Sequence, residues 1–133
     1  MKKGGTQIEK DVFDTFKNEI KNFISGDVYL QGTRPHNSTK EDCVIGYLTG
    51  INKDIQEGKV NINFYVPKIN IGTQKNVKNI ARILEIEEFM SQLVRRITDE
   101  YFFIQEQTIN SFEENEFQNL VNAVLKYKRF SND

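Results

Sequence analysis

The amino-acid sequence predicts one α+β domain, in which a mostly antiparallel sheet of about five strands carries its helices on one face. Three observations predict this fold. Apolar residues recur at helical spacing in two segments, and in a third they alternate with polar residues, as in a strand with one buried face. The 133-residue chain also has the length of a single domain and shows no internal repeat or linker. The expected order is helix, three strands, helix, two strands.

The N-terminal part is expected to begin with a loose tail, residues 1–6, followed by a helix. The apolar stripe of this helix advances in steps of four residues: Ile8, Val12, Phe16, Ile20 and Ile24. Gly26 then stands where a left-handed helix cap is expected. Two strands are predicted at residues 28–30 and 42–49, and the loop 31–41 between them is rich in turn-forming residues.

The clearest strand is predicted at residues 59–67, where two kinds of side chain alternate. The face that we expect to be buried carries Val60, Ile62, Phe64 and Val66. The opposite face carries Lys59, Asn61, Asn63 and Tyr65. Asparagine and tyrosine side chains on a solvated face also suit contact with another protein.

Residues 68–73 are expected to form a crossover loop before a helical segment at residues 74–100. This helix shows a first apolar stripe of Val77, Ile80, Ala81 and Leu84. A second stripe comprises Phe89 or Met90, Leu93, Val94 and Ile97. The register slips near residues 85–88, which predicts a kink or two short helices. Strands at residues 101–109 and 117–130 close the fold around an acidic turn, residues 111–116, and the buried face of the last strand carries Val121, Ala123, Leu125 and Tyr127.

The composition excludes several classes of function. The formal net charge of −1 lacks the basic excess typical of proteins that grip nucleic acid along its phosphates, so we expect no specific nucleic-acid binding. The single cysteine, Cys43, cannot form an internal disulfide and is predicted to be a small buried hydrophobe. No apolar run approaches the length of a membrane span, and no signal peptide is recognisable. We therefore expect a protein made in a cytoplasm, with no membrane partner.

The search for catalytic groups gives little that a reaction could use. His36, the only histidine, lacks the neighbouring cysteines or histidines of a zinc site. Ser38 lies two residues after His36, a spacing that favours a turn hydroxyl over a catalytic triad. The sequence thus predicts no enzyme and no cofactor.

One alternative, a Mg²⁺-dependent nuclease, rests on Asp42 and the triplet Glu57-Gly58-Lys59. An Asp followed by Glu-x-Lys on the next strand resembles the metal-binding pattern of restriction-endonuclease-like nucleases. In that chemistry the carboxylates would hold Mg²⁺ and the lysine would orient the attacking water. Against it, Glu57 lies in a glycine-bounded turn, the motif is short, and the chain has no basic excess to hold DNA. A small cytoplasmic adaptor is a further alternative.

A family resemblance favours a structural role. The stretch that carries it runs from Val28-Tyr29 through Arg34-Pro35 and residues 41–45 (EDCVI) to residues 60–67 (VNINFYVP). In this stretch and in the order of its elements, the chain resembles the small tail-completion and head–tail joining (neck) proteins of tailed bacteriophages. Those proteins also open with a helix, place an aromatic strand and an Arg-Pro loop before an apolar strand, and end with a helix and two strands.

The resemblance implies a structural virion protein, made in the host bacterial cytoplasm. It would form a homo-oligomeric ring at the neck or tail end and join neighbouring neck, portal or tail proteins. A closed ring uses two different patches on each subunit. The expected patches are the solvated faces of the strands at 59–67 and 117–130, together with the loops 31–41 and 50–58. The candidate subunit-interface residues are Arg34, Asn61, Asn63, Tyr65, Glu113, Glu114, Lys126 and Lys128.

Overall fold

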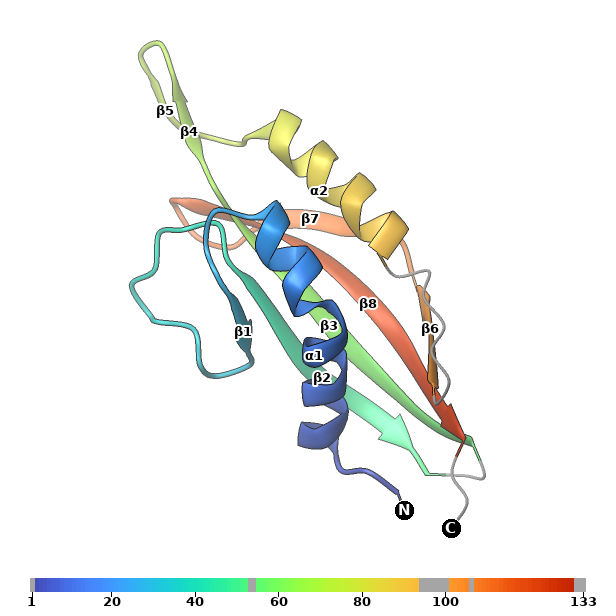
Figure 1. The fold of residues 1–133 in the computed structure, drawn as a ribbon. Coiled ribbons are helices and arrows are strands. Elements are labelled where there is room, and N and C mark those ends of the chain that lie inside the picture. Colours follow the sequence, from blue (N-terminus) through green and yellow to red (C-terminus); the bar gives the residue numbers. More distant parts are fainter. Residues whose placement is uncertain (1, 53–54, 94–100, 106, 131–133) are drawn as a thin grey trace.

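The computed structural model describes residues 2–52, 55–93, 101–105 and 107–130 (Figure 1). Two helices are present in this part of the chain, α1 (Gly5–Phe23) and α2 (Ile80–Leu93). The strands are β1 (Val28–Leu30), β2 (Cys43–Ile51), β3 (Ile55–Pro67), β4 (Ile69–Ile71), β5 (Gln74–Val77), β6 (Tyr101–Gln105), β7 (Asn110–Glu113) and β8 (Gln118–Phe130).

Among the described residues, six strands form the main sheet, in the order β1-β2-β3-β8-β6, with β7 also paired to β8. Only β1 and β2 run parallel, and the other pairs are antiparallel, which confirms the predicted α+β fold with a mostly antiparallel sheet. The sheet is built on β3 and β8, which pair without interruption from Ile55↔Phe130 to Pro67↔Gln118. β6 and β7 lie along the same edge of β8.

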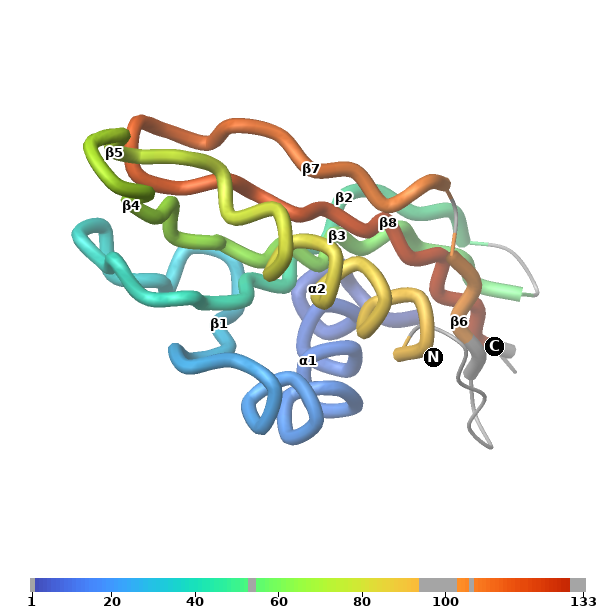
Figure 2. The backbone as a smooth tube through the Cα atoms, turned by 90° about the horizontal axis from the view of Figure 1, so that it is seen from above, coloured from blue at the N-terminus to red at the C-terminus, as the bar shows by residue number. Residues whose placement is uncertain are grey.

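Both helices cover one face of this sheet, so the domain has two layers (Figure 2). The predicted stripe of α1 is confirmed, because Ile8, Val12, Phe16 and Ile20 are all buried. The apolar faces predicted for β3 and β8 are buried opposite α1 and α2, in one continuous core. Neither described helix combines the length and hydropathy that crossing a membrane requires.

The region between β3 and α2 differs from the prediction. Residues 69–77 form a β-hairpin, β4–β5, where a loop and the start of a helix were expected. Gly72 (φ 59°) and Asn76 (φ 56°) adopt the left-handed conformation that this hairpin requires and that helices exclude. The helix begins only at Ile80, after Asn79, whose side-chain oxygen accepts a hydrogen bond from the Arg82 backbone N–H (3.2 Å) and so acts as an N-cap.

The buried stripe of α2 also differs from the first predicted stripe. Val77 belongs to β5, and Ile80 and Leu84 are exposed. The buried residues are Ile83, Ile86, Met90 and Leu93, which include part of the second predicted stripe. The helix is continuous across residues 85–88, where a kink was predicted. Val94 and Ile97 lie outside the described residues.

Several predicted boundaries are also corrected. β2 continues to Ile51 and β3 begins at Ile55, so most of the predicted loop 50–58 forms strands and Glu57 lies in β3.

Residues 5 and 6 belong to α1 and not to the tail, and the Gln56 side chain bonds both the N–H (3.1 Å) and the C=O (2.7 Å) of Lys3. The predicted acidic turn is shorter, because Asn110–Glu113 form β7 and pair with β8. Gln56 lies far from Lys3 in the sequence, so local spacing gave no indication of these bonds. β7 and β8 form a local hairpin, and β7 was missed because its four residues show no clear alternation of apolar and polar side chains.

Gly26 is present for its small size and not as a left-handed cap. α1 ends at Phe23, and the following Ile24 is extended (φ −107°). The Gly26 N–H donates to the Glu41 carbonyl oxygen (3.0 Å). A Cβ on Gly26 would meet that carbonyl oxygen at 2.5 Å and would overlap a carboxylate oxygen of Asp42. The close approach of two backbone segments therefore selects glycine here.

Replacing Gly26 with alanine is expected to lower the free energy of unfolding by about 1–3 kcal/mol, because the crowded atoms include backbone that cannot rotate away. Gly4 provides the matched control, since nothing lies within 4 Å of its added Cβ. Urea denaturation of Gly26→Ala and Gly4→Ala measures the difference. Equal midpoints for the two variants would show that the close approach does not restrict this position.

A partly buried ionic junction ties both helices to the start of β2. The Arg82 guanidinium donates to the Glu41 carboxylate (2.6 Å) and to the Phe23 carbonyl oxygen (2.7 Å), and it lies 4.3 Å from the centre of the Phe23 ring. Hydrogen bonding to Glu41 raises the pKa of Arg82 further, so the guanidinium stays charged. α1, α2 and β2 are thereby fixed relative to one another at this end of the domain.

Candidate assembly surface

The face of the sheet opposite the helices carries most of the predicted interface residues, and we call it the open face. Paired residues in neighbouring strands point to the same side of a sheet. Asn61, Asn63 and Tyr65 of β3 therefore share the open face with their β8 partners Val124, Asn122 and Leu120. Lys126 and Lys128, which pair with Lys59 and Glu57, extend the same face along β8.

An amide cluster lies at the centre of the open face. The Asn122 amide nitrogen donates to the side-chain oxygens of Asn63 (2.6 Å) and Asn61 (3.2 Å). These bonds hold the three amides flat across β3 and β8, and all three side chains are half-buried by their neighbours. The middle of the face is therefore preorganised, so little side-chain entropy would be lost when a partner covers it.

At one end of the open face Arg34, Tyr65 and Glu114 line a hollow of about 330 Å³, which also contains His36. The Arg34 guanidinium lies 3.9 Å from the centre of the Tyr65 ring, within range of a cation–π contact. Burial raises the pKa of Tyr65, and the nearby Glu114 carboxylate adds to the effect, so the phenol stays protonated. The structure thus brings three predicted interface residues together at this end.

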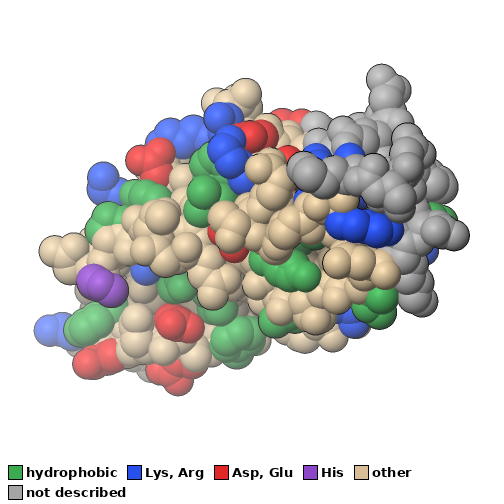
Figure 3. All heavy atoms as spheres, turned by 90° about the horizontal axis from the view of Figure 1, so that it is seen from below, with side chains coloured by type: hydrophobic (Ala, Val, Ile, Leu, Met, Phe, Trp, Pro, Cys, Tyr) green, Lys and Arg blue, Asp and Glu red, His purple; other side chains and the backbone are tan. Residues whose placement is uncertain are grey.

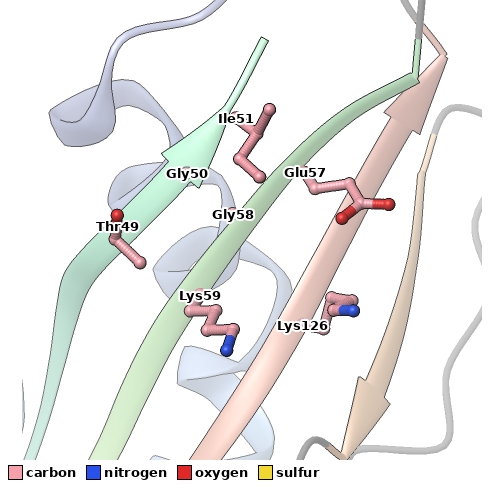
Figure 4. A pocket seen from close by; sticks show the side chains of 7 residues that line it. All are labelled: Thr49, Gly50, Ile51, Glu57, Gly58, Lys59 and Lys126. Carbon is pink, nitrogen blue, oxygen red and sulfur yellow. The ribbon is translucent and has the colours of Figure 1, made fainter. Parts of the chain in front are cut away.

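At the other end a second hollow of about 330 Å³ opens between β2, β3 and β8 (Figure 4). Figure 4 shows Ile51, Glu57 and Lys59 on the side of the strands away from α1, so this hollow belongs to the open face. The backbone of Gly50 and Gly58 contributes to its lining. A Cβ on Gly58 would point to the opposite side of the sheet, 3.6 Å from the Ile8 side chain of α1. Lys59 and Lys126 border the hollow, and the Lys128 ammonium lies 3.7 Å from the Glu57 carboxylate.

Glu113 lies apart from this arrangement. Its carboxylate accepts a hydrogen bond from the Lys68 ammonium (2.7 Å) within the same chain. Hydrogen bonding to Lys68 lowers the pKa of Glu113. Two of the charged groups predicted to pair between subunits, Glu113 and Lys128, therefore already have a partner of opposite charge in their own chain.

Large apolar side chains add to the open face at positions that the sequence prediction missed. Phe112 of β7 pairs with Leu120 and is 48% exposed, and Ile104 of β6 pairs with Lys126 and is 41% exposed. Phe112 was assigned to a turn, and Ile104 was predicted only as part of a strand. Single exposed apolar residues are common on protein surfaces, so Phe112 and Ile104 add apolar area to the open face without marking an interface by themselves. Figure 3 shows acidic, basic and hydrophobic side chains interspersed over the face that it displays.

The geometry contradicts the shared Mg²⁺ site of the nuclease alternative. Asp42 precedes Cys43 at one end of β2, whereas Glu57 pairs with Ile51 at the other end. At about 3.3 Å for each strand residue, the length of β2 places these carboxylates roughly 25–30 Å apart, too far to bind one ion. Within the described residues, no group of three or more acidic, histidine or cysteine side chains has the arrangement of a metal site.

Asp42 is instead a buried structural carboxylate. Its side chain is fully buried and accepts hydrogen bonds from Arg34 Nε (2.9 Å), Ser38 Oγ (2.5 Å) and the Asp27 backbone N–H (2.9 Å). Ser38 is thus the turn hydroxyl that its position next to His36 suggested. These bonds fix the loop 31–41 against the start of β2 and hold Arg34 over Tyr65.

Cys43 is buried, as predicted, and burial raises the pKa of its thiol well above the ordinary value. A protonated thiol in the core does not act as a nucleophile.

Comparison of the sequence with protein-family models and with curated proteins gave no match.

Proposed function

We propose that this chain is a structural virion protein of a tailed phage. It forms a homo-oligomeric ring at the neck or tail end and joins head and tail components. Its expected partners are further copies of itself and neighbouring neck, portal or tail proteins, and it reaches the virion after synthesis in the bacterial cytoplasm. The resemblance of residues 28–67 and the order of the elements support this proposal.

The open face is the observation that carries the proposal. In two-layer domains of this kind a sheet face is solvated or is covered by another polypeptide. Here the centre of the face is a fixed amide cluster, and its margins carry the exposed side chains of Phe112 and Ile104. This mixture suits a subunit contact that forms after folding, because the exposed apolar area is limited in the free chain.

The two layers supply the two different patches that a cyclic ring needs. One patch is the open face, and the other is the outer side of the helical layer. Stacking the open face of one copy against the helices of the next repeats the sheet-on-helix packing found inside the subunit. The contact is head-to-tail. The ring closes when the rotation that relates adjacent copies is a whole-number fraction of 360°.

Light scattering after size-exclusion chromatography, followed by negative-stain microscopy, tests the proposal. We expect the purified chain to form closed rings of uniform mass. Asn63→Arg should abolish them, because a bulky charge would replace the amide at the centre of the open face, and the melting temperature should change little. The matched control is Gln107→Arg, at an exposed position in the connection between β6 and β7, outside both proposed patches.

Several outcomes would count against the ring. A chain that stays monomeric at millimolar concentration, or an Asn63→Arg variant that still forms the ring, would contradict the proposal. A monomer that instead captures one unrelated cytoplasmic protein through the open face would favour the adaptor alternative.

A further inference from the structure

The β4–β5 hairpin extends well beyond the rest of the domain. Figure 1 shows it projecting past the end of the main sheet, and within the described residues its strands pair only with each other. We call residues 69–78 the arm. Ile71 on the arm is 54% exposed, and the neighbouring Ile69 is 38% exposed. An isolated two-stranded hairpin is at best marginally stable in water, so contact with a partner would stabilise an arm of this kind.

The charge of the arm is of one sign. Lys75 and Lys78 are exposed, and residues 69–78 contain no acidic side chain. Neither lysine forms an ion pair with a described residue, whereas Lys68 at the base is already bound to Glu113. The arm therefore presents two isoleucines and two uncompensated cations.

The exposed side of α2 has the complementary composition. Ile80, Leu84 and Glu88 follow one another at four-residue spacing and form a ridge, with Glu85 beside them. Ile80 and Leu84 are 60% and 59% exposed, and Glu88 is exposed and has no ion-pair partner among the described residues. We call Ile80, Leu84, Glu85 and Glu88 the α2 ridge. The ridge thus presents two large apolar side chains, the Glu88 carboxylate, and the exposed Glu85 carboxylate, which lies 3.4 Å from the Arg82 guanidinium of the same chain.

We propose that the arm of one copy lies along the α2 ridge of a neighbouring copy. This inference rests on the proposed ring function and specifies the contact between its subunits. Ile69 and Ile71 pack on Ile80 and Leu84, and the ammonium groups of the arm face the two carboxylates of the ridge.

The arm cannot satisfy this contact within its own chain. Only Lys78 and Asn79 separate β5 from α2, and Figure 1 shows the arm pointing away from the helix that follows it. The arm and the α2 ridge are therefore two different patches of one chain, which is the arrangement that a head-to-tail contact requires. The ridge belongs to the helical layer, the same side of the domain that the open face of the neighbouring copy is proposed to cover.

Charge exchange tests the contact in the full-length protein. One variant carries Lys75→Glu and Lys78→Glu on the arm, and the other carries Glu85→Lys and Glu88→Lys on the ridge. Each variant alone places like charges together, so the ring peak should be lost in light scattering and each should run as a monomer. In a ring with an even number of subunits, an equimolar mixture in which the two variants alternate restores opposite charges at every junction and should recover the ring. A single chain that carries all four substitutions restores them in a ring of any size. All four positions are exposed, so circular dichroism should match the unaltered chain. Glu85→Lys also removes an exposed ion pair with Arg82, so the melting temperature of the ridge variant should fall slightly.

The outcomes separate this inference from the proposed function. If the unaltered chain forms rings and both variants form them equally well, the contact is wrong and the ring function stands. If the unaltered chain is monomeric at every concentration, both are rejected. If the mixture yields only two-fold dimers, the arm–ridge contact is supported and the ring is rejected. If the arm variant keeps the ring but loses binding to a duplex DNA probe, the arm meets nucleic acid and the inference is overturned.

Discussion

Replacing Asp42 with alanine is expected to lower the free energy of unfolding by about 3–5 kcal/mol, because it removes one partner of a buried ion pair. Arg34, whose side chain is only 13% exposed, would keep its charge without the carboxylate that neutralises it. Ser38 and the Asp27 backbone N–H would lose their acceptor as well. Urea denaturation at pH 7 measures the change. The control is Asp14→Ala, which removes an exposed ion pair with Lys10 and should change stability by about 0.5 kcal/mol or less.

The same carboxylate makes stability depend on pH in the acid range. Burial alone raises the pKa of Asp42, but the hydrogen bonds from Ser38, the Asp27 backbone and Arg34 outweigh burial and lower the pKa below its ordinary value of 3.8. A carboxylate with a lowered pKa stabilises the fold above its unfolded pKa, and this contribution is lost as the pH falls through the folded pKa. Asp42→Asn should therefore be destabilised at pH 7 and lose less further stability below about pH 4. Parallel curves of unfolding free energy against pH for Asp42→Asn and the unaltered chain would exclude this explanation.

The elements that the sequence predicted well are those whose signal is local. The alternation in β3 and β8 and the four-residue spacing in α1 arise from side-chain geometry within one element, so the order of apolar and polar residues determines which face is buried. For the same reason the sequence placed Asn61, Asn63 and Tyr65 on one face correctly. The open face itself follows from this alternation, once both helices pack on the opposite side.

Some missed features have a weak local signal, and others depend on segments that meet only in the folded chain. The hairpin 69–77 is polar and short, so its strand pattern is weak, and the signal for the start of α2 was the N-cap Asn79 rather than the apolar residues. Leu84 was taken as core because apolar spacing does not distinguish a buried stripe from an exposed ridge. The separation of Asp42 and Glu57 likewise depends on the direction of β2, which no local motif encodes.

Phe64 is expected to be the position in the core where truncation has the largest effect. Its ring is fully buried and meets the Phe89 ring edge-on, with centroids 6.3 Å apart. Phe89 in turn stacks on Phe23 at 4.0 Å, so these three rings connect β3 through α2 to the end of α1. Phe64→Ala would remove the sheet end of this chain of contacts and leave a cavity between the layers. The free energy of unfolding should fall by about 3–5 kcal/mol.

Phe112→Ala is the matched control for Phe64→Ala, because it makes the same chemical change on the open face. Phe112 is 48% exposed, so we expect the free energy of unfolding to fall by about 1 kcal/mol or less. Light scattering should show that the homo-oligomeric ring is weakened. Phe64→Ala should show the opposite pattern. Its free energy of unfolding should fall strongly, but the homo-oligomeric ring should still form under conditions in which the variant is folded. Denaturation and light scattering on the same samples separate the two roles. If both variants lost stability equally, burial in the core would not be what distinguishes these two phenylalanines.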